Sequence, residues 1–264
     1  SAPMPTLLPG AGALAGRRTL LLPITPESDM VFTYDAVVAG GAAVNGYSGY
    51  EPTYYPALMA AIRMEDPALF EPFQRYGALD VVVMNTAPRL RAAVEHVPGA
   101  AIIERDDAVT EYRLPPKPAA YATAPGHVVP IAHLSTDCAP EIEDRALDRS
   151  LDSIWMCPQT RDATFTIDVG QPSRLAAVVT EMGQYVADYP NALTVETSID
   201  GERWDPAWTG SGLAPLVWSA IDQPTRVPLT MAFTPRTARF IRLRQTGRDS
   251  LHAWAIPEVQ VRAQ

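Results

Sequence analysis

Residues 146–170, ALDRSLDSIWMCPQTRDATFTIDVG, contain the features that decide the fold. The stretch begins as a polar turn with two aspartates, Asp148 and Asp152, and then passes Trp155. It ends as an alternating segment, which is the pattern of a half-buried β-strand. The apolar residues expected on one face of this strand are Phe165, Ile167 and Val169. A turn rich in oxygen atoms ahead of a core strand is a place where a cation can bind.

Composition limits the classes of function. The chain has 264 residues, 30 acidic against 21 basic side chains and a formal net charge of −9. A protein that binds nucleic acid or an anionic membrane surface is normally basic, so we expect neither partner. The 26 prolines are roughly twice the average usage and favour strands and connectors over long helices. No apolar run is long enough for a membrane span.

Two cysteines, Cys138 and Cys157, flank the turn at a separation of 19 residues. They can form a disulfide if the segments on either side meet, and the alternative is two buried free thiols. Other features that indicate a location outside the cytoplasm favour the disulfide. Two cysteines without paired histidines supply too few ligands for zinc.

The first half of the chain predicts a small α/β unit over residues 18–114, after a Pro/Gly/Ala-rich linker at 1–17. One predicted helix begins with Asp66 as N-cap and Pro67 in the first turn, and it stops at Gly77. The continuous apolar run at 79–85 is typical of a strand that is covered on both faces. The expected strands are 18–25, 79–85, 101–105 and 109–114, and the expected helices are 53–64, 66–77 and 88–96.

A Pro/Ala-rich connector at 115–126 separates this unit from residues 127–264, which have a different pattern. No helix is expected there, and short strands recur between turn signals, as in a β-sandwich or jelly roll. The whole chain is therefore expected to be α+β. The expected strands of the second unit are 129–134, 163–169, 175–181, 193–199, 226–232, 238–245 and 256–262.

Five pieces of the second unit, taken in order, resemble a discoidin domain, also called the coagulation factor type C domain. This fold overlaps with a large family of galactose-type carbohydrate-binding modules. The pieces are ALDRSLDSIW, TFTIDVGQPSRLAAV, LTVETSIDGERW, RTARFIRLRQTG and IPEVQV. Asp200-Gly201 is also a strong tight-turn signal in its own right. Trp204 is expected to pack on the core, and Arg239 and Arg242 are expected to form structural ion pairs.

The resemblance implies a structural calcium ion in the opening turn, because members of the family often hold one there. The oxygen ligands that it implies are the Arg145 carbonyl, the Asp148 side chain, the Ser150 carbonyl, Ser153 and Glu258. Arg149 stands where the family has glycine, and it places a cation beside the site. The alternative is that Asp148 and Ser153 only cap the turn.

The resemblance also implies sugar binding by aromatic and polar side chains on loops at one end of the sandwich. Aromatic rings stack on the CH faces of sugars, and polar groups bind the hydroxyls. His252 and Trp254 are the first choice, since they lie just before the last strand. The full set of candidates is Tyr185, Tyr189, Trp208, Trp218, His252 and Trp254, and each ring can instead cover the core.

Residues 30–114 resemble the region that follows the last membrane helix of bacterial polytopic glycosyltransferases, which use polyprenyl-phosphate sugar donors. The segment NGYSGYEP, with the tyrosines of residues 45–55, carries much of this resemblance. It implies that a membrane domain with the catalytic aspartates is missing from this chain. It also implies a location on the periplasmic or extracellular face of the inner membrane.

The leading interpretation is a non-catalytic, extracytoplasmic region that positions a glycan or glycolipid acceptor. The sequence has neither a G-x-S-x-G nor an H-E-x-x-H motif. Two alternatives remain open. The chain can be a complete secreted carbohydrate-active enzyme with an attached sugar-binding module, or a structural or adhesive sandwich.

Overall fold

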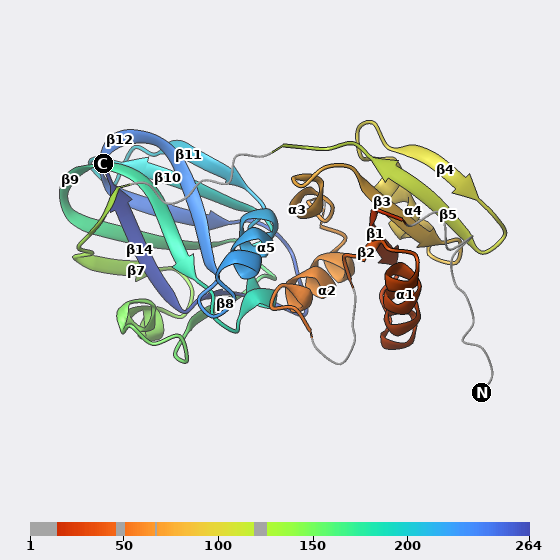
Figure 1. The fold of residues 1–264 in the computed structure, drawn as a ribbon. Coiled ribbons are helices and arrows are strands. Elements are labelled where there is room, and N and C mark those ends of the chain that lie inside the picture. The colour runs from red at the N-terminus through yellow and green to blue at the C-terminus, as the bar shows by residue number, and fades with distance from the viewer. Residues whose placement is uncertain (1–14, 46–50, 67, 119–125) are drawn as a thin grey trace. The chain divides into compact units, whose positions relative to one another are not determined.

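The computed structural model describes residues 15–45, 51–66, 68–118 and 126–264 (Figure 1). The chain divides into two compact units. Unit 1 comprises Ser1–Tyr55 and Leu69–Ala119, and unit 2 comprises Pro56–Ala68 and Ala120–Gln264. The chain therefore passes into unit 2 for a short segment, returns to unit 1 and then crosses again. The two units are described separately below.

Unit 1 contains a five-stranded mixed sheet with the strand order β2-β1-β3-β5-β4. β1 pairs in parallel with both β2 and β3, and β5 pairs antiparallel with β3 and with β4. The apolar run of β3 is almost entirely buried, as its sequence predicts. The strand bounds are β1 Arg18–Leu22, β2 Ala42–Ala43, β3 Leu79–Met84, β4 Ala101–Arg105 and β5 Val109–Leu114.

The helices of unit 1 agree with the sequence only in part. α4 (Pro88–Glu95) is confirmed, whereas the helix expected at 66–77 is reduced to the short α3 (Glu71–Gln74). α1 (Pro26–Val38) was not expected at all. Its buried face holds Phe32 and Ala36, but Met30 and Tyr34 leave its exposed face apolar as well. A helix that is apolar on both faces lacks the one-sided periodicity by which helices are recognised.

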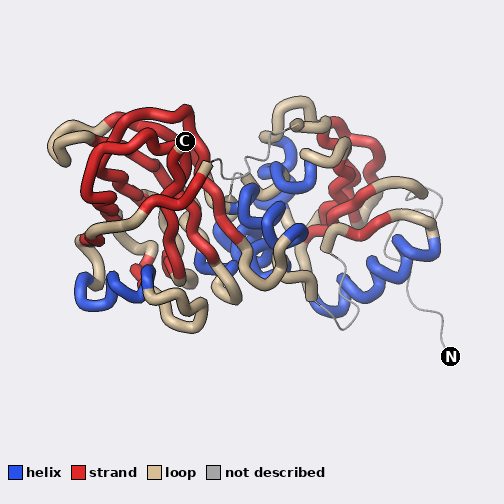
Figure 2. Tube along the Cα trace, turned by 60° about the vertical axis from the view of Figure 1, so that its left-hand side comes forward, coloured by secondary structure: helices blue, strands red, loops and turns tan. Residues whose placement is uncertain are grey.

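Unit 2 is a β-sandwich built around two long strands, β9 (Ala163–Glu181) and β12 (Pro228–Gln245) (Figure 2). The first half of β9 pairs with the second half of β12 and with β7, and its second half pairs with β12 and β14. A register shift between Ala232 and Arg236 marks where β12 changes partner residues. The main sheet has the order β11-β10-β12-β9-β14-β6, and β8 and β13 form a separate pair.

The sandwich has two ends, the loop end and the hairpin end. The loop end is where β9 finishes at Glu181 and β14 starts at Glu258, which are register partners. The hairpin end is where β9 and β12 bend and where β10 turns into β11. The remaining strand bounds are β6 His127–Val129, β7 His133–Thr136, β8 Trp155–Pro158, β10 Leu193–Ser198, β11 Asp205–Gly210, β13 Ala253–Ile256 and β14 Glu258–Ala263.

The predicted sandwich is confirmed, although several strand bounds differ. The segments expected at 163–169 and 175–181 are the two halves of β9, and those at 226–232 and 238–245 are the halves of β12. The expectation of no helix after residue 127 is wrong. Leu213–Asp222 forms α5, and Pro140–Leu147 forms a 3₁₀ helix (η2). A second 3₁₀ turn, η3, covers Val186–Asp188.

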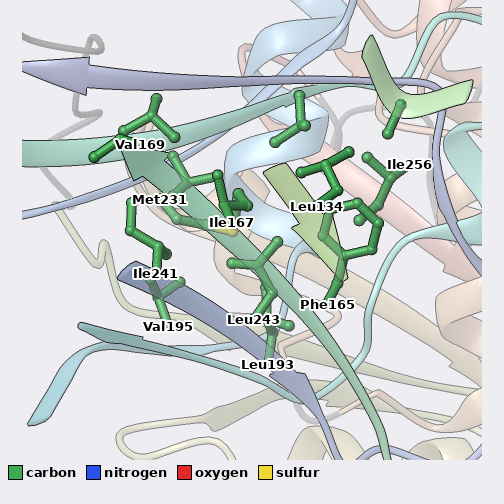
Figure 3. Close-up of a cluster of buried hydrophobic side chains, with 14 of the residues drawn as sticks. Leu134, Phe165, Ile167, Val169, Leu193, Val195, Met231, Ile241, Leu243 and Ile256 are labelled. Atoms are coloured by element: carbon green, nitrogen blue, oxygen red, sulfur yellow. The ribbon is translucent and has the colours of Figure 1, made fainter. Parts of the chain in front are cut away.

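The inner faces of the strands form one core of aliphatic and aromatic side chains (Figure 3). Phe165 and Ile167 point inward from β9, as the alternation in the sequence predicts. The Trp155 ring lies edge-on to Phe165 at 4.8 Å and to Trp254 at 4.9 Å. Fully burying one such side chain stabilises the fold by roughly 2–3 kcal/mol.

A segment from the first half of the chain is part of unit 2. This segment, Pro56–Ala68, contains most of the helix α2 (Tyr55–Met64) and the buried Asp66. The Asp66 carboxylate accepts hydrogen bonds from the Tyr189 hydroxyl at 2.9 Å and the Ser211 hydroxyl at 2.8 Å. Unit 2 is therefore not formed by consecutive residues alone. None of the helices in the described ranges is long and apolar enough to cross a bilayer.

Candidate functional site

The opening turn at 148–153 is held together by its own hydrogen bonds. The Ser150 N–H donates to Asp148 Oδ1 at 2.9 Å, and the Ser153 hydroxyl donates to Asp148 Oδ2. These donors, with the Ser153 hydroxyl first, lower the pKa of Asp148 below its ordinary value. Asp148 and Ser153 therefore cap the turn, as one of the two interpretations of the sequence requires.

Arg149 connects this turn to the last strand. Its backbone N–H donates to Glu258 Oε2 at 2.8 Å. Its φ of +66° lies in the left-handed region, which explains why glycine suits this position. A non-glycine residue there is strained by about 1 kcal/mol. Burial raises the pKa of Glu258, and the nearby Glu181 and Asp148 carboxylates add to that rise.

The ligands expected for calcium are oxygen atoms, which is the chemistry that calcium selects. The hydrogen bonds above bring Asp148, Ser150 and Ser153 together and join Glu258 to the same turn. Arg145 lies in the last turn of η2, directly ahead of Asp148. The donor chemistry therefore fits a calcium ion. Within 15–45, 51–66, 68–118 and 126–264, no group of three or more His, Cys, Asp or Glu side chains could hold a metal.

The disulfide between Cys138 and Cys157 is present, with the two Cα atoms 5.9 Å apart. It joins the segment after β7 to β8 and lies against the core. The Trp155 indole N–H donates to the Cys138 carbonyl oxygen at 2.9 Å, across the same connection. The disulfide thus connects the two segments that flank the opening turn, and Glu258 connects the turn to the last strand.

Three of the aromatic residues expected to contact sugar are buried, so this part of the expectation is wrong. Trp254 is only 2% exposed and packs against Trp155 in the core. Tyr189 has no exposed surface, and its hydroxyl binds Asp66. Trp218 lies in α5, on the buried side of that helix. Each of these rings covers or fills the core. The strand pattern in the sequence does not tell whether a nearby aromatic ring faces the core or the solvent.

Burial strongly raises the pKa of Tyr189, and the Asp66 carboxylate adds to that rise. Tyr189 therefore remains a neutral hydrogen-bond donor to Asp66. Nearby, the Gln159 side chain donates to the carbonyls of Tyr189 at 3.0 Å and Ala253 at 2.8 Å. The Gln245 side-chain amide donates to the side-chain Oε1 of Gln159. These buried hydrogen bonds fix the loops that the sequence predicts as a sugar-binding surface.

The other three candidates keep some exposed surface. The His252 ring forms a hydrogen bond through Nδ1 with Asp249 Oδ2 at 2.7 Å, and His252 directly precedes β13. Tyr185 lies just before η3, and its hydroxyl donates to the Asp152 carbonyl at 3.3 Å. Trp208 lies on the edge strand β11 and packs partly on the core. His252 and Tyr185 belong to loop-end segments, whereas Trp208 does not.

A groove of about 600 Å³ lies at the loop end and is called the loop-end groove. It is lined by residues of the opening turn, by residues 128–131 and by the first residues of β14. Its apolar lining is Val128, Val129, Pro130, Ile131, Leu147, Leu151 and Val259. Its polar lining is Arg149, Glu181, Arg226, Glu258 and Gln260.

The polar lining is ordered by contacts among its own members. The Arg226 guanidinium is paired with Glu181 Oε2, and the Gln260 amide donates to Glu181 Oε1 at 3.1 Å. The Glu258 side chain is mostly buried and faces the same groove. Sequence reasoning missed Arg226, Gln260 and Glu181. No local motif marks them, because strand pairing and a long connection bring them together.

The outer-face arginines behave as expected. Arg239 forms a two-pronged ion pair with Asp168 at 2.8 and 2.7 Å, and Arg242 pairs with Glu196 at 2.7 Å. Trp204, expected in the core, instead lies partly exposed under the Arg242 guanidinium at 4.2 Å. A cation above an indole ring is a favourable contact that needs no burial.

Comparison with known protein families gives one match, and it lies within unit 2. The model of the F5/8 type C domain matches residues 135–258. That range contains the opening turn, both long strands and the start of β14, so unit 2 contains a discoidin-like domain. No curated protein sequence matches the chain.

Several solved structures are similar to about half of the chain. A truncated AlyQ with CBM32 and alginate lyase domains shares 18% identity at a TM-score of 0.42, over 51% of this chain and 32% of that one. CpGH89CBM32-5 from Clostridium perfringens, in complex with GalNAc-β-1,3-galactose, shares 14% at 0.40, over 52% and 100%. Chitosan-binding module 1 from Paenibacillus sp. IK-5 shares 18% at 0.39, over 49% and 92%. Similarity at this level does not identify a ligand for this chain.

Proposed function

We propose that the discoidin-like domain binds a glycan through the loop-end groove. The observation that carries the proposal is the composition of that groove, which combines an aliphatic floor with ordered donors and acceptors. A sugar ring has CH faces that favour apolar contact and hydroxyls that both donate and accept hydrogen bonds. Concave sites with mainly apolar walls and a few placed polar groups are typical of small-ligand binding.

The charges in the groove indicate a neutral or weakly charged sugar. Arg149 and Arg226 donate hydrogen bonds, Glu181 and Glu258 accept them, and the formal charges of the four cancel. The Arg149 guanidinium has no ion-pair partner within the described residues, so it can donate to a hydroxyl. Since none of the described residues that line the groove is aromatic, we expect weak binding, with a dissociation constant on the order of millimolar.

His252 extends this proposal to the neighbouring loop. Nδ1 of the ring is bonded to Asp249, which leaves Nε2 available for a sugar hydroxyl. Leu251, next to it, is largely exposed and offers an apolar contact. Tyr185 lies between this loop and the opening turn, through its bond to Asp152. A glycan longer than one sugar unit can therefore contact both segments.

We further propose that the chain is a non-catalytic, extracytoplasmic part of a membrane glycosyltransferase. The support is the sequence resemblance of residues 30–114, of which 46–50 and 67 lie outside the described residues. The glycan would then be an acceptor, free or lipid-linked, that is held for an attached membrane domain. The disulfide supports the periplasmic or extracellular side of the inner membrane, because disulfides persist in oxidising compartments.

A bound calcium ion is proposed as a structural element only. Asp148, Ser153 and Glu258 would hold it by their side chains, with carbonyl oxygens of Arg145 and Ser150. Its charge would offset the carboxylates of the turn. The expected result is a higher melting temperature in calcium than in chelator. Equal melting temperatures would remove calcium from the account and leave the hydrogen-bonded turn.

Calorimetric titration with a panel of neutral, amino and uronic sugars tests the binding proposal. Arg149→Gly removes the guanidinium at a position whose φ suits glycine, so it should weaken the best ligand about fivefold. Arg244→Ala is the matched control, since it removes an exposed arginine from the outer face of β12. Flat titrations across the panel, or equal affinity in wild type and Arg149→Gly, would refute the proposal.

A further inference from the structure

A second groove, of about 510 Å³, lies at the hairpin end of the sandwich. One wall is the turn between β10 and β11, and the other is the bend of β12 at residues 234–237. The groove exists because β12 loses its regular pairing between Ala232 and Arg236, so its backbone leaves the sheet there. We call it the hairpin-end groove.

The turn that forms the first wall is rigid. Asp200 Oδ1 accepts hydrogen bonds from the N–H groups of Glu202 at 2.9 Å and Arg203 at 3.0 Å, and from the Ser198 hydroxyl at 3.0 Å. These bonds, the Arg203 N–H first, lower the pKa of Asp200 to about 2. The carboxylate is therefore ionised at neutral pH, and its Oδ2 carries none of these three bonds.

Arg236 is held in place between the two walls of the groove. Its Nη1 donates to the Pro206 carbonyl at 3.1 Å and its Nε donates to the Thr234 carbonyl at 3.5 Å. Within the described ranges no carboxylate pairs with Arg236, nor with Arg203 on the opposite wall. A guanidinium fixed by carbonyls keeps donors free and loses little entropy when it binds a further acceptor.

The groove also offers apolar surface and a balanced charge. Ile199, at the tip of the turn, is 60% exposed, although it is β-branched and apolar. Asp200 and Asp205 balance Arg203 and Arg236, so the formal charges of the lining cancel. An anionic ligand would meet both aspartates and a cationic ligand both arginines. A neutral ligand with many hydroxyls can use acceptors and donors together.

We propose that the hairpin-end groove is a second carbohydrate site, which takes a neutral pyranose unit. Arg236 and Arg203 donate to its hydroxyl oxygens, Asp200 and Asp205 accept its hydroxyl protons, and Ile199 contacts a CH face. The site is separate from the loop-end groove. Arg174, paired with Thr237, and Glu181 are seven residue steps apart along β9, which corresponds to about 23 Å of strand.

Amide chemical shifts of the isotope-labelled full chain test this site independently of the loop-end groove. Neutral mono- and disaccharides are titrated, and the amides of 199–203 and 234–237 are followed together with those of 147–151 and 258–260. We expect saturable shifts at the hairpin-end amides. Arg236→Gln should weaken them about fivefold and leave the loop-end shifts unchanged, whereas Arg149→Gly should do the reverse.

Asp205→Asn provides the same test if Arg236→Gln does not fold, because it changes the opposite wall and preserves the side-chain shape. The site is refuted if the amides of 199–203 and 234–237 stay unshifted with every sugar. It is also refuted if their shifts have equal affinity in wild type and in the folded variant. Shifts there with an extended peptide but with no sugar would equally overturn the carbohydrate assignment.

Discussion

The two ends of the sandwich are stabilised in different ways. At the loop end, Asp66 and Tyr189 are 123 residues apart in sequence and form a buried hydrogen bond. At the hairpin end, Asp200 is bonded only to residues two or three positions away. The Asp66–Tyr189 bond is therefore a long-range contact that a single substitution can remove, whereas the hydrogen bonds of Asp200 are local to its own turn. The following predictions test this difference, in order of decreasing expected effect.

Replacing one tryptophan at each end compares how much each end contributes to the free energy of unfolding. Trp254→Ala at the loop end should destabilise the unit by about 3–5 kcal/mol, because it leaves a large cavity against Trp155. Trp204→Ala at the hairpin end removes a partly exposed ring under Arg242 and should cost about 1 kcal/mol. Urea denaturation of the two variants measures the free energies of unfolding. Similar losses would contradict the distinction between the ends.

The disulfide contributes the next largest effect. Its loop spans 19 residues of separation, so replacing both cysteines by alanine should cost about 3 kcal/mol through the entropy of the unfolded chain. The same denaturation experiment, run with and without reductant on wild type, gives an independent measure. A wild-type protein whose unfolding curve does not change on full reduction would show that this covalent connection does not stabilise the unit.

Asp66→Ala should destabilise unit 2 by about 2 kcal/mol. It leaves the buried Tyr189 hydroxyl and the Ser211 hydroxyl without their acceptor. Tyr189→Phe removes one of the two hydrogen bonds and keeps the ring, so its loss should be smaller. Asp200→Ala is the comparison at the hairpin end. If it costs more than Asp66→Ala, the long-range contact is not the main support of the loop end.

The pH dependence of stability should have opposite signs at the two ends. Burial raises the pKa of Asp188 and of Glu258 at the loop end, so their contribution is present at low pH and is lost as pH rises through those values. Hydrogen bonds lower the pKa of Asp200 to about 2, so its contribution is present above pH 4 and is lost on acidification.

Unfolding free energies measured from pH 2 to pH 8 check these signs. Glu258→Gln should reduce the loss of stability as the pH rises above about 4.5, and Asp200→Asn should reduce the gain between about pH 2 and 4. Each variant is the control for the other, because each removes one carboxylate and the two carboxylates lie at opposite ends of the sandwich. Identical pH profiles in the two variants would contradict the assigned environments.

The sequence predicts the fold of unit 2 well because the signals that define it are local. The alternation in β9, the Asp200-Gly201 turn and the ion pair of Arg239 all follow from neighbouring residues or strand spacing. The helix α5 was missed because LAPLVWSAID is a short, mostly apolar and mostly buried segment, and a run of this kind does not distinguish a buried helix from a buried strand.

The candidate site was predicted less well, for a physical reason. A tryptophan in a short segment before a strand can cover the core or face solvent, and only the packing around Trp254 decides between them. Asp66 was expected as a helix N-cap; its link to Tyr189 depends on a chain crossing that no local pattern records. The groove residues Glu181, Arg226 and Gln260 meet through strand register, which is also a long-range property.

The domain bounds and several loops remain predictions. The expected domains were 18–114 and 127–264, and the structure places Pro56–Ala68 with unit 2. The tyrosine-rich loop lies partly outside the described residues, at 46–50, as do most of the linker and the connector. Tyr55 and Asn45, at its margins, both donate hydrogen bonds to the buried Asp29. The ends of this loop are thus fixed inside unit 1.

Hydrogen–deuterium exchange of the full chain, with and without its best-binding glycan, tests whether the loop-end groove binds sugar. We expect slower exchange at residues 147–152 and 223–228, because the ligand would cover the loop-end groove that these segments border. Unchanged exchange in both segments at saturating glycan, or protection confined to the outer face of β10 and β12, would contradict it.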